Sequence, residues 1–278
     1  MGEAANSRPE LTRRDRITVP TLLERKRAGE QIVTLTAYDY PSARLAERAG
    51  VDVVLVGDTL GIMALGYDTT VPVTLEEMLH HVRAARRGVK RALLLADMPF
   101  GTYQTGPEDA IRNAIRLMKE GGAQAVKLEG GAPVVETVRR MTCMGIPVMG
   151  HLGLLPQSVH MLGGYKAQGQ RPEDAQRMLA DAKALEEAGA FALVIEAVPA
   201  ELASQITASI SIPTIGIGAG PGCDGQVQVW HDILGIHPGK DLRHVKRYAS
   251  IGDLTESALR DYVEDVRRGR FPTKENSL

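Results

Sequence analysis

The 278-residue sequence has two cysteines, few aromatic residues, no excess of either charge and no long apolar run. Cys143 and Cys223 stand far apart without a Cys-x-x-Cys spacing, which fits neither a disulfide framework nor a structural zinc site. We therefore expect two structural thiols in a reducing cytoplasm. With 33 basic and 34 acidic side chains and 4% aromatic residues, the chain lacks both the positive footprint and the stacking surfaces typical of nucleic-acid-binding proteins.

The apolar runs are only as long as a buried strand, which excludes a helical membrane span and leaves no candidate for a secretion signal. Residues 1–16 mix charged residues, proline and asparagine without apolar periodicity, and we expect a flexible arm. No internal linker or shift of composition follows, so residues 17–278 are predicted to form a single domain.

From residue 18 onward the sequence alternates between helix patterns and short apolar strands. Helix starts are marked by proline or by capping patterns such as Thr74-Leu-Glu-Glu77. Strands are expected at residues 32–37, 51–56, 92–97, 125–131, 147–151, 191–196, 213–220 and 226–230. Residues 152–171 are the longest irregular stretch, which is typical of a loop that covers an active site.

Eight strands separated by helices, in a chain of this length, predict an α/β fold of the (β/α)8 TIM barrel type. A doubly wound open sheet is the alternative. Residues 253–268 have an amphipathic pattern, and we expect a C-terminal helix that packs on the outside of the barrel or on a neighbouring subunit.

Chemically active side chains stand at or just after the ends of the expected strands. All strands of a barrel end at one mouth, so these residues should converge although they are distant in sequence. Lys127 and Glu129 are two positions apart on one strand and should point to the same side. The set is Asp58, Asp97, Lys127, Glu129, His151 and Glu196.

Taken one at a time, most of these residues have a structural explanation as well. Either aspartate could cap the next helix, His151 could be a hydrogen-bonded core histidine, and Glu196 could pair with an arginine. Lys127 is harder to explain in that way, because an ammonium inside a barrel needs an anionic partner.

Two aspartates and a third carboxylate form an oxygen-rich site that suits a hard cation, of which magnesium fits best. We expect Asp58 and Asp97 to bind Mg²⁺ directly and Glu129 to bind it through water. A 2-oxo acid can chelate such an ion through its carboxylate and its ketone, and Lys127 would neutralise the charge of the acid.

Several longer motifs occur in order from about residue 16 to residue 272: VGDTLG at 56–61, GYDTT at 66–70, ADMPF at 96–100, VKLEGG at 126–131, GHLGLLPQS at 150–158, GGYK at 163–166 and GIGAG at 216–220, followed by DGQ at 224–226. Together they resemble the ketopantoate hydroxymethyltransferase family. The resemblance implies a magnesium-dependent (β/α)8 enzyme of pantothenate biosynthesis, the pathway to coenzyme A. Such an enzyme transfers a hydroxymethyl group from methylene-tetrahydrofolate to 3-methyl-2-oxobutanoate, giving 2-dehydropantoate.

The resemblance also implies roles for individual residues. The metal carboxylates fall on Asp58, Asp97 and Glu129, with one Mg²⁺ per subunit. Contacts to the keto acid fall on Asp58, Thr59, Asp97 and Lys127, with His151 near the substrate, and the proton acceptor falls on Glu196. Thr59 stands where the family usually has serine, which keeps the hydroxyl. A cytoplasmic homo-oligomer, a decamer in many members, is implied as well.

Two other functions remain open on the residues alone. A magnesium-dependent lyase that breaks C–C or C–P bonds on a related barrel would share the metal and the keto acid, but we expect it to need a cysteine loop that this sequence lacks. A barrel that only binds metabolites would not need Asp58, Asp97, Lys127 and Glu196 together.

Overall fold

The computed structural model describes residues 16–236 and 243–278, so the predicted arm, residues 1–16, lies outside the described residues except for Arg16. The chain forms two compact units, residues 1–227 and 228–278. The extension of one domain over residues 17–278 stays a prediction.

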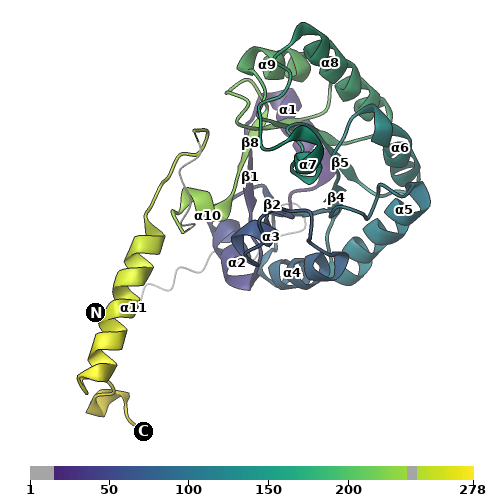
Figure 1. Ribbon diagram of the computed structural model, residues 1–278. Helices are drawn as coiled ribbons and strands as arrows, with labels where there is room; N and C mark the ends of the chain where they lie inside the picture. Colours follow the sequence, from purple (N-terminus) through teal and green to yellow (C-terminus); the bar gives the residue numbers. More distant parts are fainter. Residues whose placement is uncertain (1–15, 237–242) are drawn as a thin grey trace. The chain divides into compact units, whose positions relative to one another are not determined.

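The first unit is a closed barrel of eight strands, in which each strand pairs with the next along the chain (Figure 1). The fold prediction is confirmed, and because the sheet closes on itself, the open doubly wound sheet is excluded. The strands are β1 (Ile32–Thr36), β2 (Val53–Val56), β3 (Leu93–Asp97), β4 (Ala125–Lys127), β5 (Val148–Gly153), β6 (Ala192–Glu196), β7 (Thr214–Ile217) and β8 (Gly225–Gln228).

Helices connect the strands and surround the sheet (Figure 1). The capping pattern at Thr74 is confirmed, since its hydroxyl accepts from Glu77 N at 3.2 Å and the Glu77 carboxylate accepts from Thr74 N at 2.7 Å. The helices of this unit are α1 (Val19–Ala28), α2 (Tyr40–Ala49), α3 (Leu60–Met63), α4 (Leu75–Gly88), α5 (Pro107–Arg116), α6 (Val135–Cys143), α7 (Val159–Leu162), α8 (Pro172–Glu187) and α9 (Ala200–Ser209). A π-helical turn, η2 (Leu117–Gly121), extends α5.

The inside of the barrel is filled by every second residue of its strands. Val53 and Leu55 of β2, Leu93 and Leu95 of β3, and Met149 of β5 are buried members of one apolar cluster. Side chains alternate between the two faces of a strand, so the residue two positions beyond each buried one points inward as well. This alternation carries polar side chains to the mouth, because Asp97 follows Leu95 and His151 follows Met149.

Several strand ends and one loop differ from the expected ranges. Strand β7 stops at Ile217 and not at residue 220, since Gly218 has a left-handed φ of 61°. Strand β4 stops at Lys127, and Gly130, which lies within the expected range of the strand, has a left-handed φ of 126°. Strand β8 stops at Gln228, because Trp230 begins helix α10 (Trp230–Ile233). The stretch 152–171 is not wholly irregular: β5 runs on to Gly153, and a 3-10 turn (Pro156–Ser158) and α7 follow.

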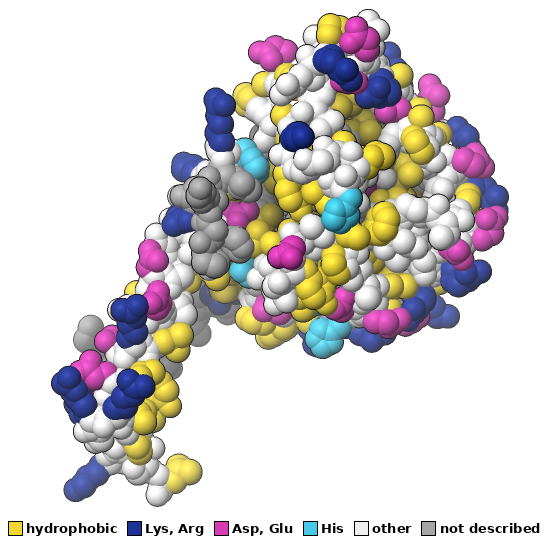
Figure 2. Space-filling model, in the orientation of Figure 1, with side chains coloured by type: hydrophobic (Ala, Val, Ile, Leu, Met, Phe, Trp, Pro, Cys, Tyr) yellow, Lys and Arg dark blue, Asp and Glu magenta, His cyan; other side chains and the backbone are white. Residues whose placement is uncertain are grey.

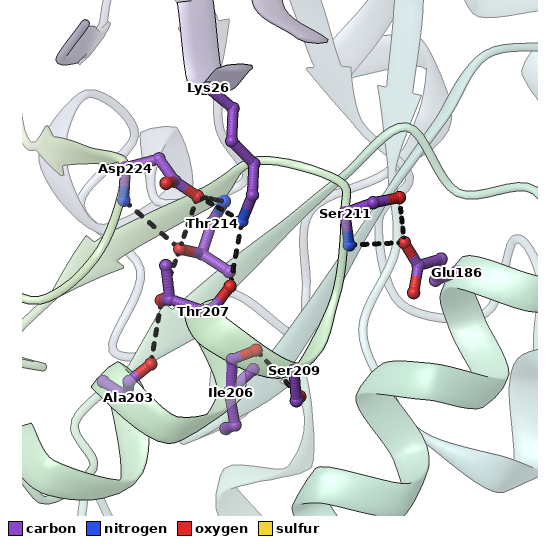
Figure 3. Close-up of polar contacts among 9 residues, drawn as sticks. All are labelled: Lys26, Glu186, Ala203, Ile206, Thr207, Ser209, Ser211, Thr214 and Asp224. Atoms are coloured by element: carbon purple, nitrogen blue, oxygen red, sulfur yellow. Dashed lines mark hydrogen bonds and ion pairs between the residues drawn. The ribbon is translucent and has the colours of Figure 1, made fainter. Parts of the chain in front are cut away.

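A polar network closes the barrel at the end opposite the mouth (Figure 3). Lys26 of α1 donates to Asp224 Oδ2 at 2.9 Å and to Thr207 O at 3.0 Å. Asp224 Oδ2 also accepts from Thr214 N at 2.8 Å, and the main-chain oxygen of Asp224 accepts from Ile32 N at 2.9 Å. Asp224 thereby ties the start of the last strand to the first strand, to β7 and to α1.

The second unit contains α10, α11 (Ile251–Arg267) and a 3-10 turn (Lys274–Asn276). The predicted C-terminal helix at 253–268 is therefore present and begins two residues earlier. It exposes large apolar side chains, among them Leu254 at 65% and Leu259 at 58%. The surface on which it packs stays a prediction. In the described part of the chain, we find no helix with the length and apolar character needed to cross a membrane.

Candidate active site

Four neighbouring strands, β3 to β6, each deliver one charged or ionisable side chain to the mouth of the barrel. Lys127 Nζ lies 3.0 Å from Asp97 Oδ1 and 3.3 Å from His151 Nδ1. His151 Nε2 lies in turn 3.2 Å from Glu196 Oε2. The expected convergence of these four residues is thus present, as one continuous line of contacts across the mouth.

Burial differs along this line. Asp97, Lys127 and His151 are each exposed by 4% or less, whereas the Glu196 side chain is 20% exposed. Glu196 is therefore the member of the line that a molecule entering the mouth can contact most readily.

Asp58 lies in the loop after β2 and joins this line through Asp97. Its main-chain nitrogen donates to Asp97 Oδ2 at 3.0 Å. The helix-capping explanation does not hold for either aspartate, since Asp97 accepts from the neighbouring loop and Asp58 makes no capping bond to α3. The adjacent Thr59 is half-buried, and its hydroxyl lies 2.7 Å from the hydroxyl of Tyr38.

Glu129 faces the same side as Lys127, as the spacing of two residues predicts. Its Oε1 lies 3.5 Å from His151 Nδ1, and its Oε2 accepts from the main-chain nitrogen of Gln157 at 3.0 Å. The main-chain nitrogen of Glu129 donates to the hydroxyl of Tyr103. Every predicted site residue is therefore found at the mouth.

Gln157 is a site residue that the sequence does not predict. Its amide donates to Asp58 Oδ2 at 2.8 Å and to Met98 O at 2.9 Å, while its oxygen accepts from Tyr103 at 2.7 Å. It links Asp58 to Glu129, and it is only 5% exposed. The one signal for it in the sequence is an amide within the GHLGLLPQS motif, which carries no chemical meaning until the loop is folded.

The charges of the site depend on one another. Burial raises the pKa of Asp58 well above its usual range, and the carboxylates of Asp97 and Glu129 add to this effect. Burial by itself would lower the pKa of Lys127, but the same carboxylates outweigh it and the pKa is raised. The site therefore combines a firmly charged ammonium with carboxylates that hold more negative charge than it neutralises.

His151 is not a lone core histidine, because two carboxylates face its ring. Burial and the Lys127 ammonium both lower its pKa, yet Glu129 and Glu196 raise it to about 9. An imidazolium can donate toward Glu129 through Nδ1 and toward Glu196 through Nε2. At neutral pH we therefore expect His151 to carry a proton and to hold both carboxylates in place.

The donor set suits a hard cation with few protein ligands. Asp97 Oδ1 is a buried oxygen that accepts no hydrogen bond, although the Lys127 ammonium lies beside it. Over residues 16–236 and 243–278, no three or more His, Cys, Asp or Glu side chains are arranged to enclose a metal ion. Two aspartates are the number of direct carboxylates that Mg²⁺ usually takes, with water and substrate as its other ligands. The residues present therefore fit a magnesium ion.

Comparison with known proteins matches nearly the whole chain to one family. The model of the family described as "Ketopantoate hydroxymethyltransferase" matches residues 16–274. A protein named 3-methyl-2-oxobutanoate hydroxymethyltransferase from Carboxydothermus hydrogenoformans is 59% identical over 95% of this chain and 96% of that relative.

Two solved structures share the barrel at low sequence identity. A phosphonopyruvate hydrolase in complex with oxalate and Mg²⁺ is 15% identical, with a TM-score of 0.59, over 93% of this chain and 92% of the other. A 2,3-dimethylmalate lyase is 19% identical, with a TM-score of 0.57, over 93% and 91%. At this identity the likeness shows the fold alone.

Proposed function

The chain belongs to the ketopantoate hydroxymethyltransferase family, and from that premise we propose that it transfers the one-carbon unit of methylene-tetrahydrofolate to 3-methyl-2-oxobutanoate, forming 2-dehydropantoate for pantothenate biosynthesis. It is an enzyme of the transferase class. The observation that carries the proposal is the buried line from Asp97 through Lys127 and His151 to Glu196, which ends in an accessible carboxylate.

Lys127 is the residue that holds the keto acid. Its ammonium is fully buried and charged, and it is the natural counter-ion for a 2-oxo carboxylate that enters the mouth. The Thr59 hydroxyl supplies a further donor, and the His151 ring lies beside Lys127. These three residues orient the acid so that its C3 hydrogen faces Glu196.

Asp58 and Asp97 are the residues that would hold a magnesium ion directly, one ion per subunit, with Glu129 near enough to act through water. When bound, the ion would polarise the ketone and so acidify the hydrogen on C3. Gln157 fixes one oxygen of Asp58, and the main-chain nitrogen of Asp58 fixes one oxygen of Asp97, while the other oxygen of Asp97 lies beside Lys127.

Glu196 is the base in this proposal. Its carboxylate takes the C3 proton, and C3 then forms a bond to the methylene carbon of the folate. Both bonds from that carbon to the two folate nitrogens break. One nitrogen takes the proton that Glu196 removed from C3, the other takes a proton from a water whose hydroxyl bonds to the carbon, and tetrahydrofolate and a hydroxymethyl group result. His151 holds Glu196 Oε2, so that the other oxygen of Glu196 is available for the proton.

We further propose a cytoplasmic homo-oligomer, of the decameric kind that the family resemblance implies. The apolar side chains that α11 exposes support assembly, since apolar patches of this kind mark contact surfaces. Sedimentation velocity at micromolar concentration tests it: a species far heavier than the 30.0 kDa chain is expected, and a monomer alone contradicts it.

The lyase alternative gains no support beyond the shared barrel. A single experiment separates the two functions: the protein is incubated with 3-methyl-2-oxobutanoate, methylene-tetrahydrofolate and Mg²⁺, and 2-dehydropantoate is measured. The base is tested by NMR in heavy water without folate. Glu196→Gln should lower the exchange of the C3 hydrogen by about 10²-fold or more, the scale of general-base catalysis. Exchange at the wild-type rate would move the base role to another group.

A further inference from the structure

A cavity of about 460 Å³ lies beside the active site, among the loops that follow β3, β4 and β5. Tyr103 and Glu129 belong to its wall, and both also belong to the active site. The cavity is thus an immediate neighbour of the reacting centre. Apart from Glu129, none of the residues given a role toward the keto acid or the metal lines it.

Most of the wall is apolar. Phe100 comes from the loop after β3, Leu155 from the loop after β5 and Met178 from α8. Phe100 is 46% exposed, so a flat surface is open to an incoming molecule. Figure 2, which looks onto the face that carries α3 and α7, shows hydrophobic side chains gathered there. Such walls suit a ring system better than a small acid.

The charged groups of the wall differ in the hydrogen bonds and ion pairs that they already make. Three carboxylates, from Glu129, Asp174 and Asp181, face one guanidinium, from Arg177. Asp174 is engaged on both oxygens, by Arg171 at 2.8 Å and by Arg177 at 2.7 Å. Glu129 is engaged as well, through Gln157 and His151.

Asp181 differs from the other two carboxylates. It is half-buried, and its Oδ1 accepts from the main-chain nitrogen of Ala132 at 2.9 Å. Its Oδ2 lies over the backbone of Gly131, where even a methyl group on that glycine would collide with it. The wall therefore presents an acceptor oxygen and a surplus of negative charge. An anionic keto acid would be repelled here, whereas a neutral ring that carries N–H donors would be attracted.

We infer that this cavity, between Phe100 and Asp181, is the docking site for the ring system of the one-carbon donor, an inference that rests on the proposed function. The aminopyrimidinone edge of a reduced folate places an amino group beside a ring N–H, and a carboxylate accepts such a pair. With that edge on Asp181, the ring lies against the apolar wall. Its one-carbon unit then faces the end of the cavity that Glu129 shares with the active site.

The test measures the two substrates separately. In Asp181→Asn, which keeps an oxygen for Ala132 N but loses the charge, KM for methylene-tetrahydrofolate should rise about tenfold or more. In Phe100→Ala it should rise several-fold. In both variants KM for 3-methyl-2-oxobutanoate and the folate-independent exchange of its C3 hydrogen should stay within about twofold of wild type. Calorimetric titration with tetrahydrofolate alone should show the same weakening.

Matched controls come from α5, away from the cavity. Asp109→Asn removes another half-buried carboxylate, and Ile115→Ala removes an apolar side chain that is 46% exposed, like Phe100. Neither should change either KM. Unchanged folate KM and affinity in both cavity variants would overturn the inference while wild-type product formation upheld the proposed function. Absence of 2-dehydropantoate with the wild-type protein would overturn the proposed function itself.

Discussion

Replacing Gln157 with alanine should weaken both the fold and the metal site, because this amide links the two sides of the mouth. The change removes one hydrogen bond to the Asp58 carboxylate and three bonds to neutral groups, Met98 O, the Tyr103 hydroxyl and the Gln104 amide. A bond to a charged group contributes about 1.5–3 kcal/mol and a neutral one about 0.5–1.5 kcal/mol. Since water entering the space offsets part of this, we expect a loss of about 3 kcal/mol in the free energy of unfolding.

The same change should also weaken metal binding, since Asp58 loses the group that orients it. Partners of this kind typically alter metal affinity by about 10–100-fold. We therefore expect the Kd for Mg²⁺, measured by calorimetry with 3-methyl-2-oxobutanoate present, to rise at least tenfold. Urea denaturation without metal measures the change in the free energy of unfolding separately from the change in metal affinity.

Gln124→Ala is the matched control, because Gln124 uses its amide oxygen for one bond from Leu94 N at 3.1 Å, near the opposite end of the barrel. It should lose about 1 kcal/mol of stability and leave the Kd for Mg²⁺ unchanged. Equal metal affinity in Gln157→Ala and wild type, or a stability loss no larger than that of Gln124→Ala, would refute the reasoning.

Three further outcomes are expected. Asp58→Ala and Asp97→Ala should each abolish turnover and flatten the magnesium titration, and near-wild-type titration curves in both would contradict the ligand assignment. The pKa of His151 rises from 6.5 to about 9 on folding, so its contribution to stability is full below pH 6.5 and is lost as pH rises through 9. Metal-free urea titrations at a series of pH values should show this fall in the free energy of unfolding, and the fall should be smaller in His151→Asn. An equal dependence of stability on pH in the two proteins would exclude His151 as the source. Thr74→Ala should cost about 1 kcal/mol by removing the cap of α4, without effect on KM, and unchanged stability would show that the cap contributes nothing.

The fold and the site residues on the strands can be predicted from the sequence for the same reason, which is the alternation of side chains along a strand. Once Leu95 and Met149 are recognised as buried, Asp97 and His151 must point into the same barrel two positions later. The closed barrel follows from the number of strands. Each of these inferences needs only local periodicity and the rule that all strands end at one mouth.

Gln157 escapes that kind of prediction because its contacts are not periodic. It lies in a 3-10 turn, and its amide meets a carboxylate 99 positions earlier in the chain. The early end of β4 escapes it too, since apolar composition alone does not show that Gly130 adopts a left-handed φ. Both features depend on loop geometry, which three-dimensional packing decides rather than residue type.

The network around Asp224 has a consequence for folding while the protein is being synthesised on the ribosome. The ion-pair partner of Lys26 is 198 residues further along the chain, and β1 can pair with its second neighbouring strand only after β8 has been synthesised. Until residues 224–228 have left the exit tunnel, the nascent chain can offer at most an open sheet with two unpaired edges. Such edges pair readily with other chains, so synthesis that stalls before Asp224 leaves a product prone to aggregation.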